Sequence, residues 1–220
     1  MFNIKDYKHV IWDFNGTLLD DAWLFVEIMN SILSNQQMNT IDLDKYREIF
    51  CFPIKNYYLS LGFNVNNNSF KQSNLKFIKK YNERRYDAKL FSNTKNILFD
   101  LSKKNITQSI LSAQNQSLLN DLTKFYQIRD YFTEIYGVNN FHALGKIERG
   151  LELLKTLNIN KNEILIIGDT IYDYDVATKL EIRCLLTSQG HQNFQRLKNT
   201  DAHVIRKIDS IADIFSGKSC

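Results

Sequence analysis

Residues that cross-link or interrupt a fold are scarce in this 220-residue sequence, which contains three cysteines, one proline and eight glycines. The cysteines, Cys51, Cys184 and Cys220, are odd in number, far apart in sequence and without CxxC or Cys/His spacing. We therefore expect reduced thiols in a cytoplasmic protein. The single proline is Pro53, so long uninterrupted helices are allowed throughout the second half of the chain.

Long apolar runs and blocks of like charge are also missing. No run of about 18 apolar residues occurs, and the N-terminal segment has no apolar region or cleavage site of a signal peptide, so neither membrane spanning nor export is expected. The formal net charge is +4, but the lysines and arginines are spread along the chain, so no nucleic-acid partner is expected. No GxGxxG follows an expected strand, which disfavours a dinucleotide-dependent oxidoreductase.

Short β-branched runs alternate with longer amphipathic stretches, which is the pattern of a parallel sheet covered by helices. Hydrophobic residues make up 44% of the chain and charged residues 24%, as in a soluble globular protein large enough for a sizeable core. The sequence thus predicts the α/β fold class. The expected strands are 9–14, 107–112, 134–137, 163–168, 183–187 and 202–205.

About ninety residues without a convincing strand separate the first two expected strands, which is too long for a simple crossover. Amphipathic patterns predict helices over 21–37, 42–50, 55–62, 69–86 and 93–104. We therefore expect an all-helical cap subdomain over residues 21–88, inserted into an α/β core made of residues 1–20 and 89–220. The last of these helices belongs to the core.

The first expected strand ends at Asp13, and Asn15-Gly16 then gives a sharp turn before Thr17. Ligands of parallel sheets bind beyond the carboxyl ends of the strands, so Asp13 is well placed for chemistry. A turn in which Asp13 merely hydrogen-bonds the backbone explains the same residues.

A second acidic group follows the apolar run that ends at Gly168, where Asp169, Asp173 and Asp175 occur within seven residues. If a helix begins near Thr170, Asp169 is its N-cap and Asp173 lies on the same face. Two carboxylates at this spacing repel unless the helix dipole or a cation compensates them. A metal site and an acidic N-cap remain alternatives here.

Two further polar residues follow the same logic. Ser112 ends an apolar strand just before an expected helix, where a hydroxyl and backbone N–H groups can hold a phosphate. Lys146 stands in the first turn of another helix, a position that the helix dipole slightly disfavours for a cation. Taken singly, an N-cap serine and a surface lysine explain both residues equally well.

The order of these features along the chain resembles the haloacid dehalogenase superfamily, in particular its phosphoglycolate-phosphatase-like members with a small helical cap. Asp-x-Asn-Gly-Thr follows the first strand, Ser112 a later strand and Lys146 a helix start, before Gly-Asp-x-x-x-Asp at Gly168 to Asp173. The resemblance covers nearly the whole chain. It implies a Rossmann-like core and a phosphoric monoester hydrolase that acts on a small phosphorylated metabolite.

The resemblance also implies roles for individual residues. Asp13 would attack the phosphorus to form an aspartyl-phosphate, which water then hydrolyses. One magnesium ion would be bound by Asp13, the backbone carbonyl of Asn15 and Asp169, with Asp173 orienting the ion or its waters. Lys146 would pair with Asp13 and with the phosphoryl oxygens.

Substrate contacts are implied in the same way. Thr17 and Ser112 would contact the phosphate together with the backbone N–H groups of Gly16 and Ala113. Arg47, in the cap segment that faces the site in cap-bearing relatives, would contact an anionic leaving group. An amphipathic cap helix without substrate contacts explains Arg47 as well.

Asn15 departs from the family pattern, because most phosphatases of this superfamily have an aspartate there as general acid and base. Asn15 cannot donate and recover a proton, and positioned proton transfer is worth about 10²–10⁴-fold in rate. The chain could favour good leaving groups such as aryl or acyl phosphates, recruit another acid, or bind phosphate esters as a regulator with little turnover. Cleavage of a carbon–phosphorus bond would need a Schiff-base lysine, for which Lys45 and Lys55 are the nearest candidates; a phosphomutase would need the missing aspartate.

Overall fold

A six-stranded sheet in which all strands run parallel forms the centre of the protein, in the order β5-β4-β1-β6-β7-β8. The computed structural model describes residues 7–66, 68–139 and 145–211. The strands are β1 (His9–Trp12), β4 (Thr107–Asn115), β5 (Glu134–Val138), β6 (Ile164–Gly168), β7 (Arg183–Thr187) and β8 (His203–Ile205). The α/β class expected from the sequence is confirmed.

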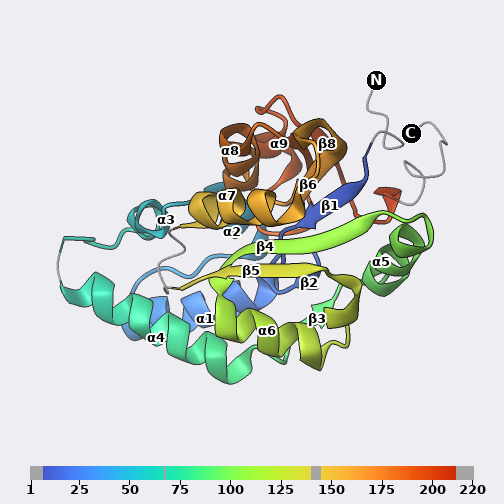
Figure 1. Ribbon diagram of the computed structural model, residues 1–220. Helices are drawn as coiled ribbons and strands as arrows, with labels where there is room; N and C mark the ends of the chain where they lie inside the picture. The colour runs from blue at the N-terminus through green and yellow to red at the C-terminus, as the bar shows by residue number, and fades with distance from the viewer. Residues whose placement is uncertain (1–6, 67, 140–144, 212–220) are drawn as a thin grey trace.

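Helices cover both faces of this sheet, and the side-chain alternation of β1 explains why. Val10 and Trp12 pack into a core cluster with α5 (Thr94–Lys103) and α6 (Gln116–Phe125). Ile11 points to the opposite face, into a second cluster with α7 (Lys146–Leu157) and α8 (Ile171–Leu180). In Figure 1, α7 and α8 lie on one side of the sheet and α6 on the other. β6 is buried along its whole length, as expected of a strand covered on both faces.

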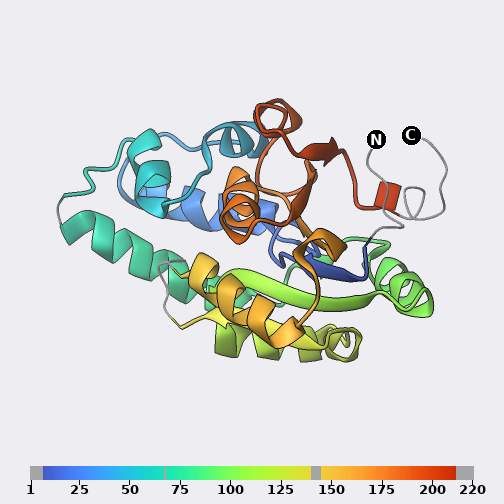
Figure 2. The ribbon, with the colours of Figure 1, turned by 45° about the horizontal axis from the view of Figure 1, so that its top comes forward.

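A helical insertion leaves the core after β1 through a short antiparallel pair, β2 (Leu19–Asp20) with β3 (Lys89–Leu90). Its helices are α1 (Ala22–Asn35), α2 (Leu43–Ile49), α3 (Ile54–Ser60) and α4 (Asn68–Arg84). In Figures 1 and 2, α3 and α4 lie at one end of the molecule and α5 lies at the other. Because α5 leads into the start of β4, the insertion is placed at the carboxyl ends of the strands.

Element boundaries differ from the sequence-based expectations in two informative places. β4 continues to Asn115, past Ser112, because its pairing with β5 shifts register between Leu111 and Asn115 and continues to Val138. β2 and β3 were not predicted, since two residues are too few to show a period. The five helices expected over 21–104 each begin and end within two residues of their predicted bounds.

Two other expectations concern the whole chain. Cys51 and Cys184 form no disulfide, and Cys220 lies outside the described residues. No helix in the described part of the chain is long and apolar enough to cross a membrane. The expected division into a core of residues 1–20 and 89–220 and a cap of residues 21–88 stays a prediction.

Candidate active site

Three buried carboxylates meet at the carboxyl ends of β1 and β6. Asp13 directly follows β1 and Asp169 directly follows β6, and these two strands pair side by side from His9 to Trp12. Asp173 reaches the same point from the first turn of α8. One oxygen from each of Asp13, Asp169 and Asp173 lies within 4.8 Å of the other two. The structure therefore brings the predicted acidic residues together.

Lys146 provides the positive charge at this cluster. It is the first residue of α7 and is 1% exposed, and its Nζ lies 2.5 Å from Asp13 Oδ1 and 2.6 Å from Asp173 Oδ1. Burial alone would lower the pKa of Lys146, but the two carboxylates outweigh it and raise that pKa above its ordinary value. Asp13 Oδ2 has no hydrogen-bond partner among the described residues, which leaves this oxygen free at the site.

Asp173 anchors the lysine and also fixes the start of α8. Its Oδ2 accepts from the Thr170 backbone N–H at 3.0 Å and from the Thr170 hydroxyl at 2.7 Å. The N-cap of α8 is therefore Thr170, and the prediction of Asp169 as N-cap is wrong. Asp169 instead directly follows β6, and its carboxylate is turned toward the cluster. Burial opposes ionisation of Asp173, but Lys146 and Thr170 outweigh it and lower its pKa.

Asp169 is held from two sides. Its Oδ1 accepts from the Thr17 hydroxyl at 3.1 Å and its Oδ2 from the His191 backbone N–H at 2.6 Å. Gly16 makes this close packing possible, because its φ is +74° and a Cβ there would collide with the Asp169 carboxylate and the His191 ring. Thr17 thus contacts the carboxylate cluster in this structure.

A divalent cation fits the donor set of this site. Burial raises the pKa of Asp169 to about 6, and burial with repulsion from Asp173 and Asp169 raises the pKa of Asp13 despite Lys146. Such crowded, desolvated carboxylates are costly to ionise without a cation. Hard oxygen donors are what Mg²⁺ prefers. Both oxygens of Asp173 are engaged, by Lys146 and by Thr170, whereas Asp13 keeps a free oxygen and Asp169 has no lysine partner, so Asp13 and Asp169 are the candidate direct ligands.

The raised pKa values predict how magnesium stabilises the fold at different pH. Carboxyl groups of the unfolded chain ionise near pH 4. The stability that the raised pKa values of Asp13 and Asp169 contribute is therefore present below that pH, and it is lost as the pH rises through the pKa values of the folded protein. A bound cation favours the ionised forms. We expect saturating Mg²⁺ to raise Tm by roughly 5–10 °C at about pH 8 and by much less at about pH 5. An equal rise at both pH values, or one retained in Asp169→Asn, contradicts this assignment.

Asn15 is fixed in place by two partners that the sequence did not indicate. Its side-chain amide donates to Asp21 Oδ2 at 2.6 Å and to the Tyr81 hydroxyl at 2.7 Å, and Tyr81 in turn donates to Asp21 Oδ2 at 3.0 Å. Asp21 is fully buried. The amide of Asn15 is therefore paired with the carboxylate of Asp21. Its N–H groups point toward Asp21 and away from the carboxylate cluster.

His191 links this network to the insertion. Its Nε2 lies 3.3 Å from Asp21 Oδ1, and its Nδ1 lies 2.7 Å from the Tyr46 hydroxyl. Burial alone would lower the pKa of His191, but Asp21 and Asp169 outweigh it and raise that pKa. Sequence reasoning missed His191, although the signal was present: the residue follows β7, the strand beside β6, and could be expected at the same sheet edge. No comparable signal marks Tyr46 or Tyr81.

A cavity of about 150 Å³ opens onto the cluster and is lined by Asp13, Asn15 and Lys146 from the core. Ser112 and Ala113 also line it, but Ser112 lies within β4, and its hydroxyl accepts from the Gln114 backbone N–H at 3.1 Å. α6 begins at Gln116 with Asn115 as its N-cap, so the segment from Ile110 to Asn115 does lead into a helix, but a strand end and an N-cap at Ser112 are wrong.

The Gly16 backbone N–H, predicted to help cradle a phosphate, is already engaged. It donates to the Leu19 carbonyl at 2.8 Å and to Asp21 Oδ1 at 3.0 Å. This N–H therefore stabilises the turn after β1. Apart from Asp13 Oδ2, the fully buried, unpaired polar atoms of the described cavity-lining residues belong to the helical insertion.

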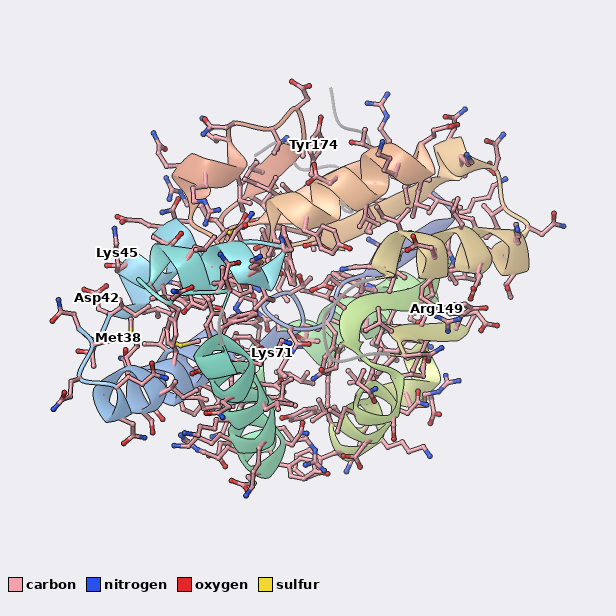
Figure 3. The ribbon with its side chains drawn as sticks, turned by 90° about the vertical axis from the view of Figure 1, so that its left-hand side faces the viewer. Met38, Asp42, Lys45, Lys71, Arg149 and Tyr174 are labelled. Atoms are coloured by element: carbon pink, nitrogen blue, oxygen red, sulfur yellow. The ribbon has the colours of Figure 1, made fainter. Side chains whose placement is uncertain are left out.

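The predicted basic residues of the cap do not line the cavity. The Arg47 guanidinium donates to the backbone carbonyls of Gly190 and Gln189 at 2.9 and 2.8 Å, so it joins the insertion to the core. Lys45 lies at the outer surface (Figure 3), where it pairs with Glu48, and Lys55 is exposed. The described structure gives Arg47 a structural contact and brings neither lysine to the site.

A parallel sheet with polar side chains gathered at the carboxyl ends of its strands is the arrangement in which α/β proteins place their ligand sites. A sequence profile of the haloacid dehalogenase-like hydrolases matches residues 10–187, so the chain belongs to this family. A search of curated proteins gave no match.

Solved structures share the fold over nearly their whole length. A haloacid dehalogenase-like hydrolase from Streptococcus pneumoniae is 20% identical with a TM-score of 0.81, covering 96% of this chain and 99% of that one. A predicted phosphatase from Clostridium acetobutylicum is 17% identical, TM-score 0.78, covering 96% and 99%. A predicted phosphoglycolate phosphatase from Haemophilus somnus is 15% identical, TM-score 0.76, covering 95% and 98%.

Proposed function

We propose that the chain is a magnesium-dependent phosphatase that hydrolyses a small phosphate monoester through an aspartyl-phosphate at Asp13. The observation that carries this proposal is the state of the Asp13 carboxylate. Oδ1 is held by Lys146 at 2.5 Å, while Oδ2 has no hydrogen-bond partner among the described residues and the side chain lines the cavity. A fixed carboxylate with one free oxygen is suited to nucleophilic attack.

The proposed reaction has two steps. Asp13 Oδ2 attacks the phosphorus, the ester P–O bond breaks, and the leaving oxygen keeps the electron pair and takes a proton from water. A water molecule then attacks the phosphorus of the aspartyl-phosphate, which releases inorganic phosphate and restores the carboxylate. Lys146, which Asp173 holds in place, orients Asp13 and favours its ionised form before the attack. Asp13 and Asp169 would hold a magnesium ion, which would offset the repulsion between the phosphate dianion and the carboxylates.

Metal removal tests this proposal. We expect hydrolysis of 4-nitrophenyl phosphate to require Mg²⁺, with kcat/KM falling by about 10²-fold or more in excess EDTA, because the uncompensated carboxylates repel the phosphate. The rate of hydrolysis is measured as release of inorganic phosphate and as absorbance of nitrophenol. Activity that persists in EDTA removes magnesium from the proposal. The intact mass of the sample must be verified, because Asn15-Gly16 is a sequence that deamidates readily and a trace of aspartate at position 15 could supply activity.

A regulatory protein that binds phosphate esters with little turnover is the second candidate. The observation that favours it is Asn15, whose amide is committed to Asp21 and Tyr81 and cannot serve as an acid. Calorimetry distinguishes the two: saturable binding of inorganic phosphate in Mg²⁺ without hydrolysis of any aryl or acyl phosphate identifies the regulator.

A further inference from the structure

The cavity above Asp13 has walls that are mostly aromatic and aliphatic. The apolar wall includes Phe25, Phe50, Phe52, Ile54, Phe77 and Leu118. Phe52 of the insertion packs against Tyr172 of α8 with ring centroids 4.8 Å apart, so rings from both parts of the chain meet at this cavity. An apolar cavity of about 150 Å³ is known to hold a benzene ring. This cavity has a similar volume, about 150 Å³, and its polar end holds the carboxylates.

Positive charge is scarce around this cavity. Among the described residues that line it, Lys146 is the single lysine or arginine, and Asp13 and Asp173 already neutralise it. The two nearby arginines face backbone carbonyls: Arg47 those of Gln189 and Gly190, and Arg196 those of Arg47 and Phe50. A carboxylate on the leaving group, such as that of phosphoglycolate, would be buried here without a free lysine or arginine to neutralise it.

Three buried polar atoms in the cavity wall have no partner among the described residues. They are the hydroxyls of Tyr57 and Tyr58 and the side-chain oxygen Oδ1 of Asn82. Tyr57 is 2% exposed and Tyr58 is 1% exposed, and burial raises both pKa values, so both hydroxyls stay neutral donors. Buried polar groups left unpaired cost free energy, so three in one wall point to a ligand that pairs with them.

From these contacts we infer that the substrate is the phosphate monoester of a small, uncharged aromatic alcohol whose ring carries a neutral hydrogen-bonding group. The inference rests on the proposed phosphatase function. The phosphate would lie at Asp13 and Lys146, the ring against the aromatic wall, and the ring substituent near Tyr57 and Tyr58.

Asn15 leads to the same class of substrate by an independent argument. Since Asn15 cannot protonate the leaving oxygen, the P–O bond must break toward an oxygen that holds negative charge well. Phenols ionise near pH 10, far below aliphatic alcohols, so a phenolate leaves without a positioned acid. The cavity shape and the missing acid thus select the same leaving group.

Hydrolysis kinetics test the leaving group. We expect kcat/KM for phenyl phosphate to exceed that for phosphoglycolate by about 10²-fold or more. Acetyl phosphate controls for leaving-group acidity, because it leaves readily but has no ring; we expect its KM to be about tenfold higher than that of phenyl phosphate. A KM for acetyl phosphate equal to or below that of phenyl phosphate overturns the aromatic assignment. So does preference for phosphoglycolate.

Binding of non-hydrolysable phosphonates tests the cavity without turnover. In Mg²⁺ we expect phenylphosphonate to bind about tenfold or more tightly than phosphonoacetate or methylphosphonate. A neutral amide on the ring, in 4-carbamoylphenylphosphonate, should lower Kd further, and in Tyr57→Phe with Tyr58→Phe the two phosphonates should have equal Kd values. Tyr86→Phe, an exposed tyrosine outside the cavity, is the matched control. No gain from the amide refutes the ring substituent.

The two measurements separate this inference from the function on which it rests. Hydrolysis that favours phosphoglycolate or acetyl phosphate means that the phosphatase proposal stands and the aromatic substrate is wrong. Tight phenylphosphonate binding without hydrolysis of any ester in Mg²⁺ means that the cavity assignment stands and the enzyme is a binder. Failure of every phosphonate to bind and of every ester to react removes both.

Discussion

Replacing Asp13 by asparagine abolishes hydrolysis, and we expect kcat to fall by about 10⁴-fold or more, because the free carboxylate oxygen is the proposed nucleophile. The fold should survive, since Lys146 keeps its second carboxylate partner, Asp173, at 2.6 Å. Burial raises the pKa of Asp13, so its ionised form is costly in the metal-free protein. We therefore expect the metal-free Tm of Asp13→Asn to equal or exceed that of the wild type.

Loss of activity with an unchanged or higher Tm distinguishes a missing nucleophile from unfolding. Asp175→Asn is the matched control, since it alters an exposed carboxyl of the same helix as Asp173 and should leave kcat unchanged. Acid quenching of the wild type during turnover should trap phosphate on the peptide that contains Asp13. Activity of Asp13→Asn within tenfold of wild type, or a phosphopeptide from another segment, would show that the nucleophile is wrong.

The sheet was predictable from sequence because each of its strands carries a local apolar signal. β6 shows this most clearly: its five residues, Ile164–Gly168, are all buried, and the run stands between polar segments. The end of β4 was not predictable, because Gln114 and Asn115 are polar and their strand conformation depends on a register shift against β5. β2 and β3 are held by tertiary pairing alone.

The residues of the site also fall into those that were predictable from sequence and those that were not. Asp13, Lys146, Asp169 and Asp173 were predictable, because each lies at a strand end or a helix start that topology places at one edge of the sheet. The contact of Asn15 with Tyr81 was not predictable, because Tyr81 comes from the far end of α4, 66 residues away in sequence. The apolar spacing of α4 indicates a buried face, but not which core residue that face meets.

The pairing of Asn15 with Asp21 determines what an aspartate at position 15 can do. In Asn15→Asp a carboxyl oxygen takes the place of the amide that lies 2.6 Å from Asp21 Oδ2. Two carboxylates this close cannot both ionise, so they share one proton. We expect the free energy of unfolding at neutral pH to fall by about 1–3 kcal/mol. We also expect little gain in hydrolysis of alkyl phosphates, since the shared proton is held between the two side chains.

Exchanging the two residues restores the pairing with donor and acceptor reversed. In Asn15→Asp combined with Asp21→Asn, the amide at 21 donates to the carboxylate at 15. The Tyr81 hydroxyl, which now accepts from Asn15 and donates to Asp21, can turn to do the opposite. We expect the double variant to recover the stability lost by Asn15→Asp and to hydrolyse alkyl phosphates about 10²–10⁴-fold faster than wild type.

The size of the gain should depend on the leaving group, which makes the exchange a sharp test. An aryl phosphate needs no acid, so its kcat should change far less than that of an alkyl phosphate. Asn15→Asp with Asp20→Asn is the matched control, since Asp20 is the neighbouring carboxylate and its side chain makes no hydrogen bond to Asn15 among the described residues. If this control gains as much as the exchange, or if Asn15→Asp gains fully by itself, Asp21 does not set the protonation of position 15. Two results together support the assignment: stability returns only in the variant with Asp21→Asn, and the rate rises for alkyl phosphates far more than for aryl phosphates. They would show that the pairing of Asn15 with Asp21 accounts for the missing general acid.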